Sequence, residues 1–139
     1  MQNQENQEKQ KEQKEQKEQK EQNIKRYHVG ARMSEMAIYN RTVYLAGQVT
    51  SDDKLDIAGQ THDVLNQIDK LLAEAGSDKS HILMCQIYIS DLTNFAAMNQ
   101  VWDAWVVPGN TPPRATVEAT LARPEWLIEI VITAALKAT

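Results

Sequence analysis

Two charged residues interrupt the apolar patterns near the end of the chain. Arg114 precedes the alternating segment Ala115-Thr116-Val117, and Glu129 lies between Ile128 and Ile130. A guanidinium group can hold a carboxylate through two parallel hydrogen bonds, and a glutamate carboxylate can accept and return a proton. Arg114 and Glu129 are therefore candidates for a functional site.

The alternation of these two segments predicts which way the charges point, because side chains two residues apart in a strand share a face of the sheet. The apolar positions, which we expect beneath the helices, are Ala115, Val117, Ala119 and Leu121 in one segment and Ile128, Ile130, Ile132 and Ala134 in the other. The opposite face then carries Arg114, Thr116, Glu118, Thr120 and Glu129, together with Leu127 and Val131. Because this face is only half polar, we expect it to be buried against another subunit.

The parity of these positions predicts how far apart the two charges lie. If the segments form an antiparallel pair with both apolar sets in the core, Glu129 faces an even-numbered residue such as Glu118 or Thr120. Glu118 is four residues from Arg114, a separation of about 13 Å along a strand. We therefore hypothesise that Arg114 and Glu129 meet across a subunit interface, an idea that a direct contact within one chain would refute.

The rest of the chain supplies elements that can position these residues. Asn40-Arg41 separates two short apolar runs, as in a β-hairpin. From Ile57 to Ala75 apolar residues recur every three or four positions, and Gly76 follows where a helix favours a left-handed cap. The expected elements are strands 36–38 and 43–45, a helix 57–75, a strand 82–90, a helix from Asn94 to 106, and strands 115–121 and 127–134. This ββαβαββ order predicts an α+β sandwich with two helices on one face of the sheet.

The first 22 residues differ in composition from the rest of the chain. They contain four consecutive copies of Lys-Glu-Gln over residues 11–22, and Met1 is their single apolar residue. A three-residue period spreads each residue type around a helix, so no face of this segment can pack against a core. We expect residues 1–22 to be a disordered tail and residues 23–139 to form one domain.

Charge and hydropathy exclude several classes of protein. The net charge is −4 and the isoelectric point is near 5.4, without the clustered Lys and Arg that bind phosphate backbones, so we expect no nucleic-acid partner. No run approaches the ~18–20 apolar residues of a membrane span, and the polar start lacks the core of a signal peptide. We expect a cytoplasmic protein with no membrane partner. A single cysteine, Cys85, fits a reducing compartment.

Several motifs occur in the order and at the spacing of one known family. They are Leu45-Ala46-Gly47-Gln48-Val49, Asp91-Leu92 followed by Phe95-Ala96-Ala97-Met98-Asn99, Pro113-Arg114-Ala115-Thr116-Val117-Glu118, and Ile128-Glu129-Ile130. Residues 24–139 resemble the Rid/YjgF reactive intermediate deaminase family of imine and enamine deaminases. The resemblance implies a chorismate-mutase-like fold with a mixed sheet, a homotrimer, and three sites between neighbouring subunits.

The resemblance also implies roles for individual residues. Arg114 matches the arginine that pairs with the carboxylate of a 2-imino or 2-enamino acid, and Glu129 matches the glutamate thought to orient or activate water. Asn99 and Gly47 match further positions of the substrate site. The implied reaction is attack of water on the imine carbon, departure of ammonia and release of a 2-oxo acid. Imines already hydrolyse in water, so positioning and one acid–base group can suffice, and we expect neither a metal nor an organic cofactor.

The chain departs from the archetypal branch of this family at three positions around the implied site. Met33 stands in place of a tyrosine, Ala46 in place of a serine, and Thr116 in place of a cysteine. The hydroxyl of Thr116 can still donate a hydrogen bond, but the other two polar contacts are missing. Residues 32–34 and 102–106 resemble a side branch, to which we assign the chain.

Other interpretations of the same residues stay open. A trimeric protein that binds small carboxylate metabolites without chemistry needs Arg114 but not Glu129. Arg114 can also form a structural ion pair across the trimer interface, with Glu118 or Glu129 as candidate partners, and Asn99 can be a polar helix position near an interface. Cys85 and the two tryptophans Trp102 and Trp105 are expected to pack in the core, and the spacing of the three histidines fits no metal site.

The acidic character of the chain predicts that it does not bind RNA. We expect no salt-dependent retention of the purified protein on immobilised RNA, because binding to phosphates relies on concentrated positive charge. Retention that falls steeply as the salt concentration rises would contradict this prediction.

Overall fold

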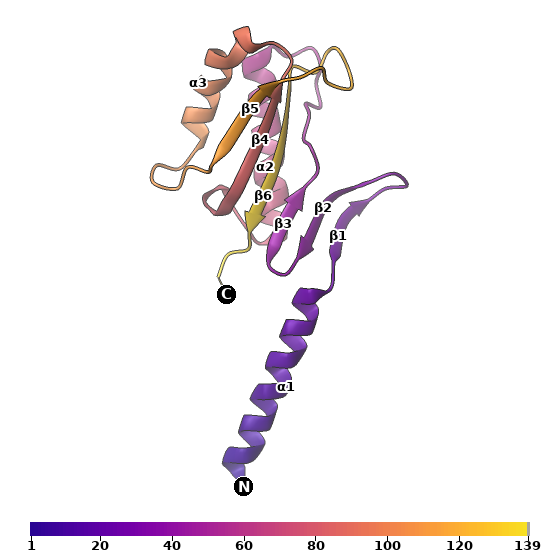
Figure 1. Ribbon diagram of the computed structural model, residues 1–139, viewed down its shortest axis with the longest axis vertical. Coiled ribbons are helices and arrows are strands. Elements are labelled where there is room, and N and C mark those ends of the chain that lie inside the picture. Colours follow the sequence, from indigo (N-terminus) through magenta and orange to yellow (C-terminus); the bar gives the residue numbers. More distant parts are fainter. Residues whose placement is uncertain (139) are drawn as a thin grey trace.

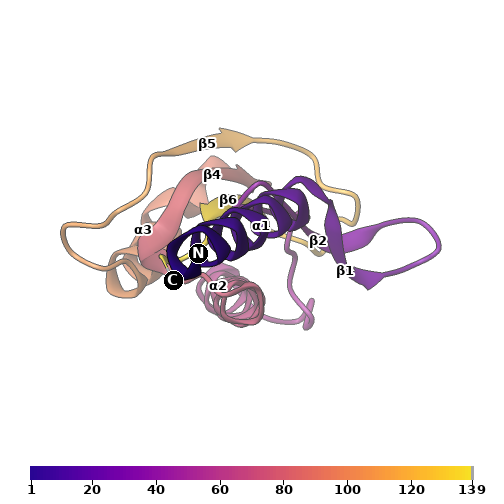
Figure 2. The same cartoon turned by 90° about the horizontal axis from the view of Figure 1, so that it is seen from below.

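The computed structural model describes residues 1–138, except for the side chain of Glu21. An N-terminal helix, α1 (Gln2–Gln22), precedes an α+β domain with a sheet of six strands (Figure 1). The strands are β1 (Lys25–Val29), β2 (Ser34–Tyr39), β3 (Thr42–Leu45), β4 (Ile82–Ile89), β5 (Arg114–Glu118) and β6 (Ile128–Ala135). The helices α2 (Ile57–Ala75) and α3 (Phe95–Trp105) pack together on one face of the sheet, as expected (Figure 2). Two short 3-10 turns, η1 (Lys79–His81) and η2 (Leu92–Asn94), precede β4 and α3.

Helix α2 has the boundaries that the sequence predicts, and both of its ends are capped. The side chain of Asp56 accepts a hydrogen bond from the amide of Gly59 at 2.8 Å, which satisfies one free amide of the first turn. Gly76 takes a left-handed conformation with φ of 88°, where a Cβ would be strained. One stripe of the helix is buried against the sheet, namely Ile57, Thr61, Val64, Leu65, Ile68 and Leu72. The burial of this stripe determines which side of α2 faces the sheet.

The central strands β4 and β6 form the middle of the core. In β6 the alternate residues Ile128, Ile130, Ile132 and Ala134 have no exposed surface, which confirms the predicted apolar set. They pair with β4, whose Cys85, Ile87 and Ile89 are equally buried. Leu83 also follows the alternation of β4, but it is exposed because the register shifts between Ile82 and Met84. Periodicity alone does not reveal such a bulge.

The N-terminal part of the sheet contains one more strand than predicted. The hairpin of β2 and β3 is confirmed, and its turn residues Asn40 and Arg41 have φ values of 52° and 63°. Strand β1 pairs with the outer edge of β2 and has no predicted counterpart. Its sequence Lys25-Arg26-Tyr27-His28-Val29 shows no apolar alternation, and four of these five residues are exposed in the structure. A strand at the edge of a sheet tolerates such polarity.

Strand β5 corrects the predicted pairing of the last two strands. It does not pair with β6, because β4 lies between them in the order β1-β2-β3-β6-β4-β5. Instead β5 runs parallel to β4, with Arg114 beside Cys85 and Thr116 beside Ile87. Because neighbours in register share a face, Arg114, Thr116 and Glu118 lie on the helix face. Ala115 and Val117 lie on the open face, the opposite of what the alternation of β5 alone predicted.

The N-terminal segment forms helix α1, whereas the sequence led us to expect disorder. Lys, Glu and Gln are strong helix formers, and residues 1–22 contain no Gly or Pro, which accounts for the helical backbone. All of the described side chains in this helix are exposed. The segment has no apolar face with which to pack on the sheet, and Figure 1 shows it projecting away from the domain. Its helical structure therefore rests on local interactions.

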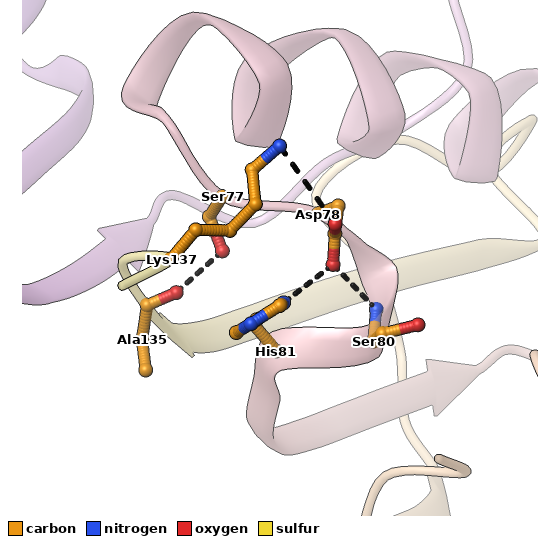
Figure 3. A network of polar contacts seen from close by, with 6 residues as sticks. All are labelled: Ser77, Asp78, Ser80, His81, Ala135 and Lys137. Carbon is orange, nitrogen blue, oxygen red and sulfur yellow. Dashed lines mark hydrogen bonds and ion pairs between the residues drawn. The ribbon is translucent and has the colours of Figure 1, made fainter. Parts of the chain in front are cut away.

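A network of polar contacts ties the end of β6 to the connection between α2 and β4 (Figure 3). The hydroxyl of Ser77 donates to the carbonyl of Ala135, and the Nζ of Lys137 lies 3.9 Å from Asp78. The other carboxylate oxygen of Asp78 accepts from the amide of Ser80 at 3.0 Å and is 2.6 Å from Nδ1 of His81. The hydrogen bond from His81 lowers the pKa of Asp78, burial opposes this shift, and the Ser80 amide and the nearby positive charges add to it.

This network predicts a pH-dependent contribution to stability. A carboxyl whose pKa is lowered by folding stabilises the protein above its unfolded-state pKa of about 3.9, and the contribution is lost as the pH falls through the lower folded-state value. We expect Asp78→Asn to lower the melting temperature by about 1–4 °C at pH 7, as for a partly exposed pair in a domain of this size. The difference in melting temperature between the native protein and this variant should become smaller below about pH 4.

Asp78→Ala is the control, because it also removes the acceptor that caps η1 and should cost stability at every pH. If the melting temperatures of the native protein and Asp78→Asn differ by the same amount at pH 7 and pH 3, the stabilising role assigned to the ionised Asp78 carboxylate is contradicted.

Candidate functional site

Arg114 is the first residue of β5, an edge strand of the sheet, and lies beneath α3. Its Nη2 donates a hydrogen bond to Oδ1 of Asn99 at 2.7 Å. The parallel register of β5 with β4 directs Arg114 to the helix face of the sheet. The position of Asn99 along α3 places its side chain within reach of the guanidinium. Two of the residues selected from the sequence are thus brought together. The amide oxygen holds one edge of the guanidinium and leaves its charge uncompensated.

Two aromatic rings of α3 border the same guanidinium. Its carbon atom Cζ lies 5.0 Å from the ring centroid of Trp102 and 5.8 Å from that of Phe95, distances at which a cation is attracted to a ring. Trp102 is 5% exposed, so it forms a buried wall of the site as well as part of the core. No site role for Phe95 was predicted from the sequence. Phe95 lies four residues before Asn99 and seven before Trp102, so the three residues share one face of a helix. This spacing could have identified Phe95 as a site residue.

A hollow of about 530 Å³ opens beside Arg114 and is lined by Leu92, Phe95, Arg114 and Thr116. Nη1 of Arg114 and the hydroxyl of Thr116 are buried, and neither has a hydrogen-bond partner among residues 1–138. Two buried donors without partners are costly, and both belong to residues that line the same hollow. Arg114, Thr116 and Asn99, all predicted site residues, therefore form one cluster suited to an anion.

The structural ion pair considered for Arg114 was one between subunits, and within a single chain the described residues form no ion pair with it. None of the carboxylates whose side chains the structure describes lies within ion-pair distance of its guanidinium. Glu118, which shares the helix face of β5, instead accepts a hydrogen bond from the amide of Leu92 at 3.1 Å. The cation thus lies at an open hollow without a counter-ion among the described side chains, which is the arrangement expected for a site that binds anionic molecules.

Glu129 belongs to a second group on the other side of the sheet. It lies opposite Tyr88 in the pairing of β6 with β4, on the open face, and is half-buried. Its carboxylate packs against Gly47, where a Cβ would lie 2.8 Å from Oε2 of Glu129. The next residue, Gln48, exchanges backbone hydrogen bonds of 2.8 and 3.1 Å with Ile130, which keeps Gly47 at this position. Only a residue without a side chain fits there without displacing the carboxylate.

The two groups are separated within one chain. Arg114 is in register with Cys85 and Glu129 with Tyr88, so they lie two strand spacings and three residues apart, about 14 Å. They also point to opposite faces of the sheet, whereas the alternation of the two strands predicted the same face. The error comes from the assumed pairing of β5 with β6. Met33, on the exposed loop between β1 and β2, is not among the residues that line the hollow at Arg114.

Cys85 lies beside Arg114 in the parallel register but is not a nucleophile. The thiol has no exposed surface, and burial raises its pKa to about 12, although the charge of Arg114 acts in the opposite direction. A thiol with this pKa is protonated at neutral pH and is unreactive. The core role that the sequence predicted for Cys85 is confirmed.

Within residues 1–138, no group of three or more His, Cys, Asp and Glu side chains is placed to hold a metal ion. None of the helices in this part of the chain combines the length and apolar character needed to cross a bilayer.

Comparisons with known proteins agree with the motifs and the fold. Residues 23–136 match the family model described as Endoribonuclease L-PSP. A RutC family protein of Haemophilus ducreyi is 51% identical over 113 residues, which cover 81% of this chain and 97% of the relative. The RutC family protein YoaB of Escherichia coli is 45% identical over 113 residues, which cover 81% and 98% of the two chains.

The structural comparison gives the same assignment. A crystal structure of a member of the YjgF protein family from Neisseria meningitidis superposes with a TM-score of 0.83 at 48% identity, covering 86% of this chain and 99% of the other. The shared topology confirms the predicted α+β YjgF-like fold. The chain therefore belongs to the Rid/YjgF family, whose members include the RutC proteins and match the Endoribonuclease L-PSP model.

Proposed function

We propose that the protein is a deaminase that hydrolyses the C=N bond of small 2-imino acids and their 2-enamino tautomers, such as 2-aminoacrylate, 2-iminopropanoate and 2-iminobutanoate. The products are the corresponding 2-oxo acid and ammonia. One observation carries the proposal: the partly buried cation of Arg114, held by Asn99, faces an open hollow with no carboxylate partner among the described residues. A substrate carboxylate is a suitable counter-ion for it.

In this proposal Arg114 is a clamp that orients the substrate. Its guanidinium and the hydroxyl of Thr116 bind the carboxylate, while Asn99 and the aromatic rings hold the guanidinium in one orientation. Fixing the substrate relative to a water molecule lowers the entropic part of the barrier. A lysine would supply the charge but not the two parallel hydrogen bonds.

Glu129 is proposed as the base that directs the water. It accepts a proton as the water oxygen bonds to C2 of the imine, and it returns the proton to the nitrogen. The resulting carbinolamine then passes its hydroxyl proton through the same carboxylate to the nitrogen as the C2–N bond breaks, so that ammonia leaves and C2 becomes the carbonyl of the 2-oxo acid. No oxidant or reductant is needed, because the oxygen and both hydrogens that are added come from water.

Because Arg114 and Glu129 of one chain lie on opposite faces, the proposed site requires a second copy. We place Arg114, Asn99 and Thr116 of one protomer opposite Glu129, Gly47 and Met33 of its neighbour in a homotrimer. The half-polar open face, with Tyr44, Met84 and Val117 exposed on or beside it, is suited to burial against another subunit. A site shared between subunits would explain why neither half is complete alone.

The alternative is a trimeric protein that binds carboxylate metabolites and performs no chemistry. It uses the same Arg114 cluster but gives Glu129 no catalytic role, so the two proposals differ in the effect of replacing Glu129. Cleavage of RNA, which the description of the matching family model suggests, is not supported by the acidic composition of the chain.

The clamp predicts a large effect of replacing Arg114. With 2-iminopropanoate generated in situ, we expect the protein to accelerate pyruvate formation over the spontaneous rate. Arg114→Ala should lower kcat/KM by about 10- to 100-fold, as for the loss of hydrogen bonds to a charged group. Arg114→Lys, which keeps the charge, should lie between this variant and the native protein.

Oligomeric state and melting temperature of each variant serve as controls for folding. Unchanged acceleration in Arg114→Ala would refute the clamp. If a trimeric native protein accelerates neither 2-iminopropanoate nor a bulkier imino acid, the binding protein becomes the better proposal.

The shared site predicts complementation between two inactive variants. Arg114→Ala and Glu129→Gln should each be impaired, since each lacks one half of every site. A refolded equimolar mixture should regain roughly a quarter of the native activity, because random trimers join an intact Arg114 to an intact neighbouring Glu129 in about that fraction of sites.

Two outcomes of the mixing experiment would contradict the proposal. Full turnover by Glu129→Gln alone would remove its role as a base. A mixture that stays as inactive as its components, while mass spectrometry detects mixed trimers, would show that both residues act from the same chain.

A further inference from the structure

Two large apolar side chains are exposed at the mouth of the hollow beside Arg114. Leu92 is 50% exposed and Phe95 is 40% exposed, and together with Arg114 and Thr116 they line the hollow. The other large apolar side chains on this side of α3, Met98 and Trp102, are buried in the core. The hollow therefore has two parts, polar donors on β5 and an apolar wall on η2 and α3.

The position of the wall relative to the cation decides what it can contact. The ring centroid of Phe95 lies 5.8 Å from Cζ of Arg114. With a carboxylate bound at about 2.8 Å from the guanidinium nitrogens, this ring is within reach of the carbons that follow C2 of a 2-imino acid. The single methyl group of 2-iminopropanoate leaves most of the wall uncovered, whereas a longer apolar side chain covers it.

The wall is held in place before any ligand binds. The amide of Leu92 donates to Oε1 of Glu118 at 3.1 Å, which links η2 to the end of β5. The carboxylate of Asp91 accepts from the amide and the hydroxyl of Thr93, at 2.9 and 2.7 Å, and so caps the turn that carries Leu92. A preformed surface contributes to selectivity because little order has to be gained on binding.

We propose that Leu92 and Phe95 determine the substrate class, favouring 2-imino acids with branched aliphatic or aromatic side chains over 2-aminoacrylate and 2-iminopropanoate. This inference rests on the proposed deaminase function and specifies the substrate of the same site. Arg114 and Thr116 recognise the carboxylate that all of these molecules share, and the apolar wall distinguishes their side chains. Each buried methylene group favours binding, and a pocket of this kind discriminates about 10- to 200-fold per methylene.

The test compares two substrates made in situ by an amino-acid oxidase from alanine and from leucine. We expect the native kcat/KM to be at least about 10-fold higher for 2-imino-4-methylpentanoate than for 2-iminopropanoate. Phe95→Ala and Leu92→Ser should each reduce this ratio about 5- to 10-fold, and Phe95→Leu, which keeps an apolar wall, should retain most of it. A ratio that is the same in the native protein and in both truncated variants would overturn the proposal.

The binding of stable 2-oxo acids separates this proposal from the proposed reaction. If the protein hydrolyses neither imine, the deaminase function fails, and calorimetry with pyruvate and 4-methyl-2-oxopentanoate still tests the wall. Tighter binding of the larger acid that is lost in Phe95→Ala would support the assigned selectivity in a binding protein. Equal affinity for both acids in the native protein would overturn it.

Discussion

The parallel pairing of β5 with β4 is the constraint on which the candidate site depends. It sets Arg114 beside Cys85, whose side chain points into the core, and so directs the arginine toward the helices. A shift of one residue in this register would turn Arg114 to the open face and bring Ala115 beneath α3. Strand β4 can impose the register because it lies between β5 and β6, and its buried residues are anchored on both sides. The pairing with the buried strand β4 thus determines which face of the sheet each side chain of the edge strand β5 points to.

The arginine directed by this register is supported by an amide and by aromatic rings, and no described residue neutralises its charge. Asn99 binds one edge of the guanidinium, and Trp102 and Phe95 border it. These contacts fix its direction while the positive charge stays available at a hollow of about 530 Å³. A carboxylate in the same place would make a more stable protein but would compete with any anionic ligand. The unpartnered donors on Arg114 and Thr116 are consistent with a site that gives up some stability for binding.

The opposite orientation of Glu129 follows from the same sheet. Residues in register across β4 and β6 share a face, so the pairing of Glu129 with Tyr88 places the carboxylate away from the helices and against Gly47. One face of the domain therefore carries a cation and hydrogen-bond donors, and the other carries a carboxylate beside the backbone of Gly47. A single chain cannot apply both to one small molecule, which is why the proposed reaction is assigned to an assembly of identical subunits.

Local patterns in the sequence determined much of the domain. The three- and four-residue spacing of apolar residues predicted α2 to its last residue, and the alternation of β6 predicted its buried set. The motifs selected Arg114, Asn99 and Thr116, which the fold brings together. These features depend on neighbours a few residues apart, so a pattern along the chain can reveal them.

Tertiary structure decided which strand lies beside β5, where the bulge in β4 exposes Leu83, and that the charged segment at β1 becomes an edge strand. It also decided that Arg114 and Glu129 face opposite ways, and that Phe95 and Leu92 border the site. A strand with alternating side chains has two possible orientations of similar local energy. The choice between them is made by contacts between residues far apart in sequence, which no local pattern records.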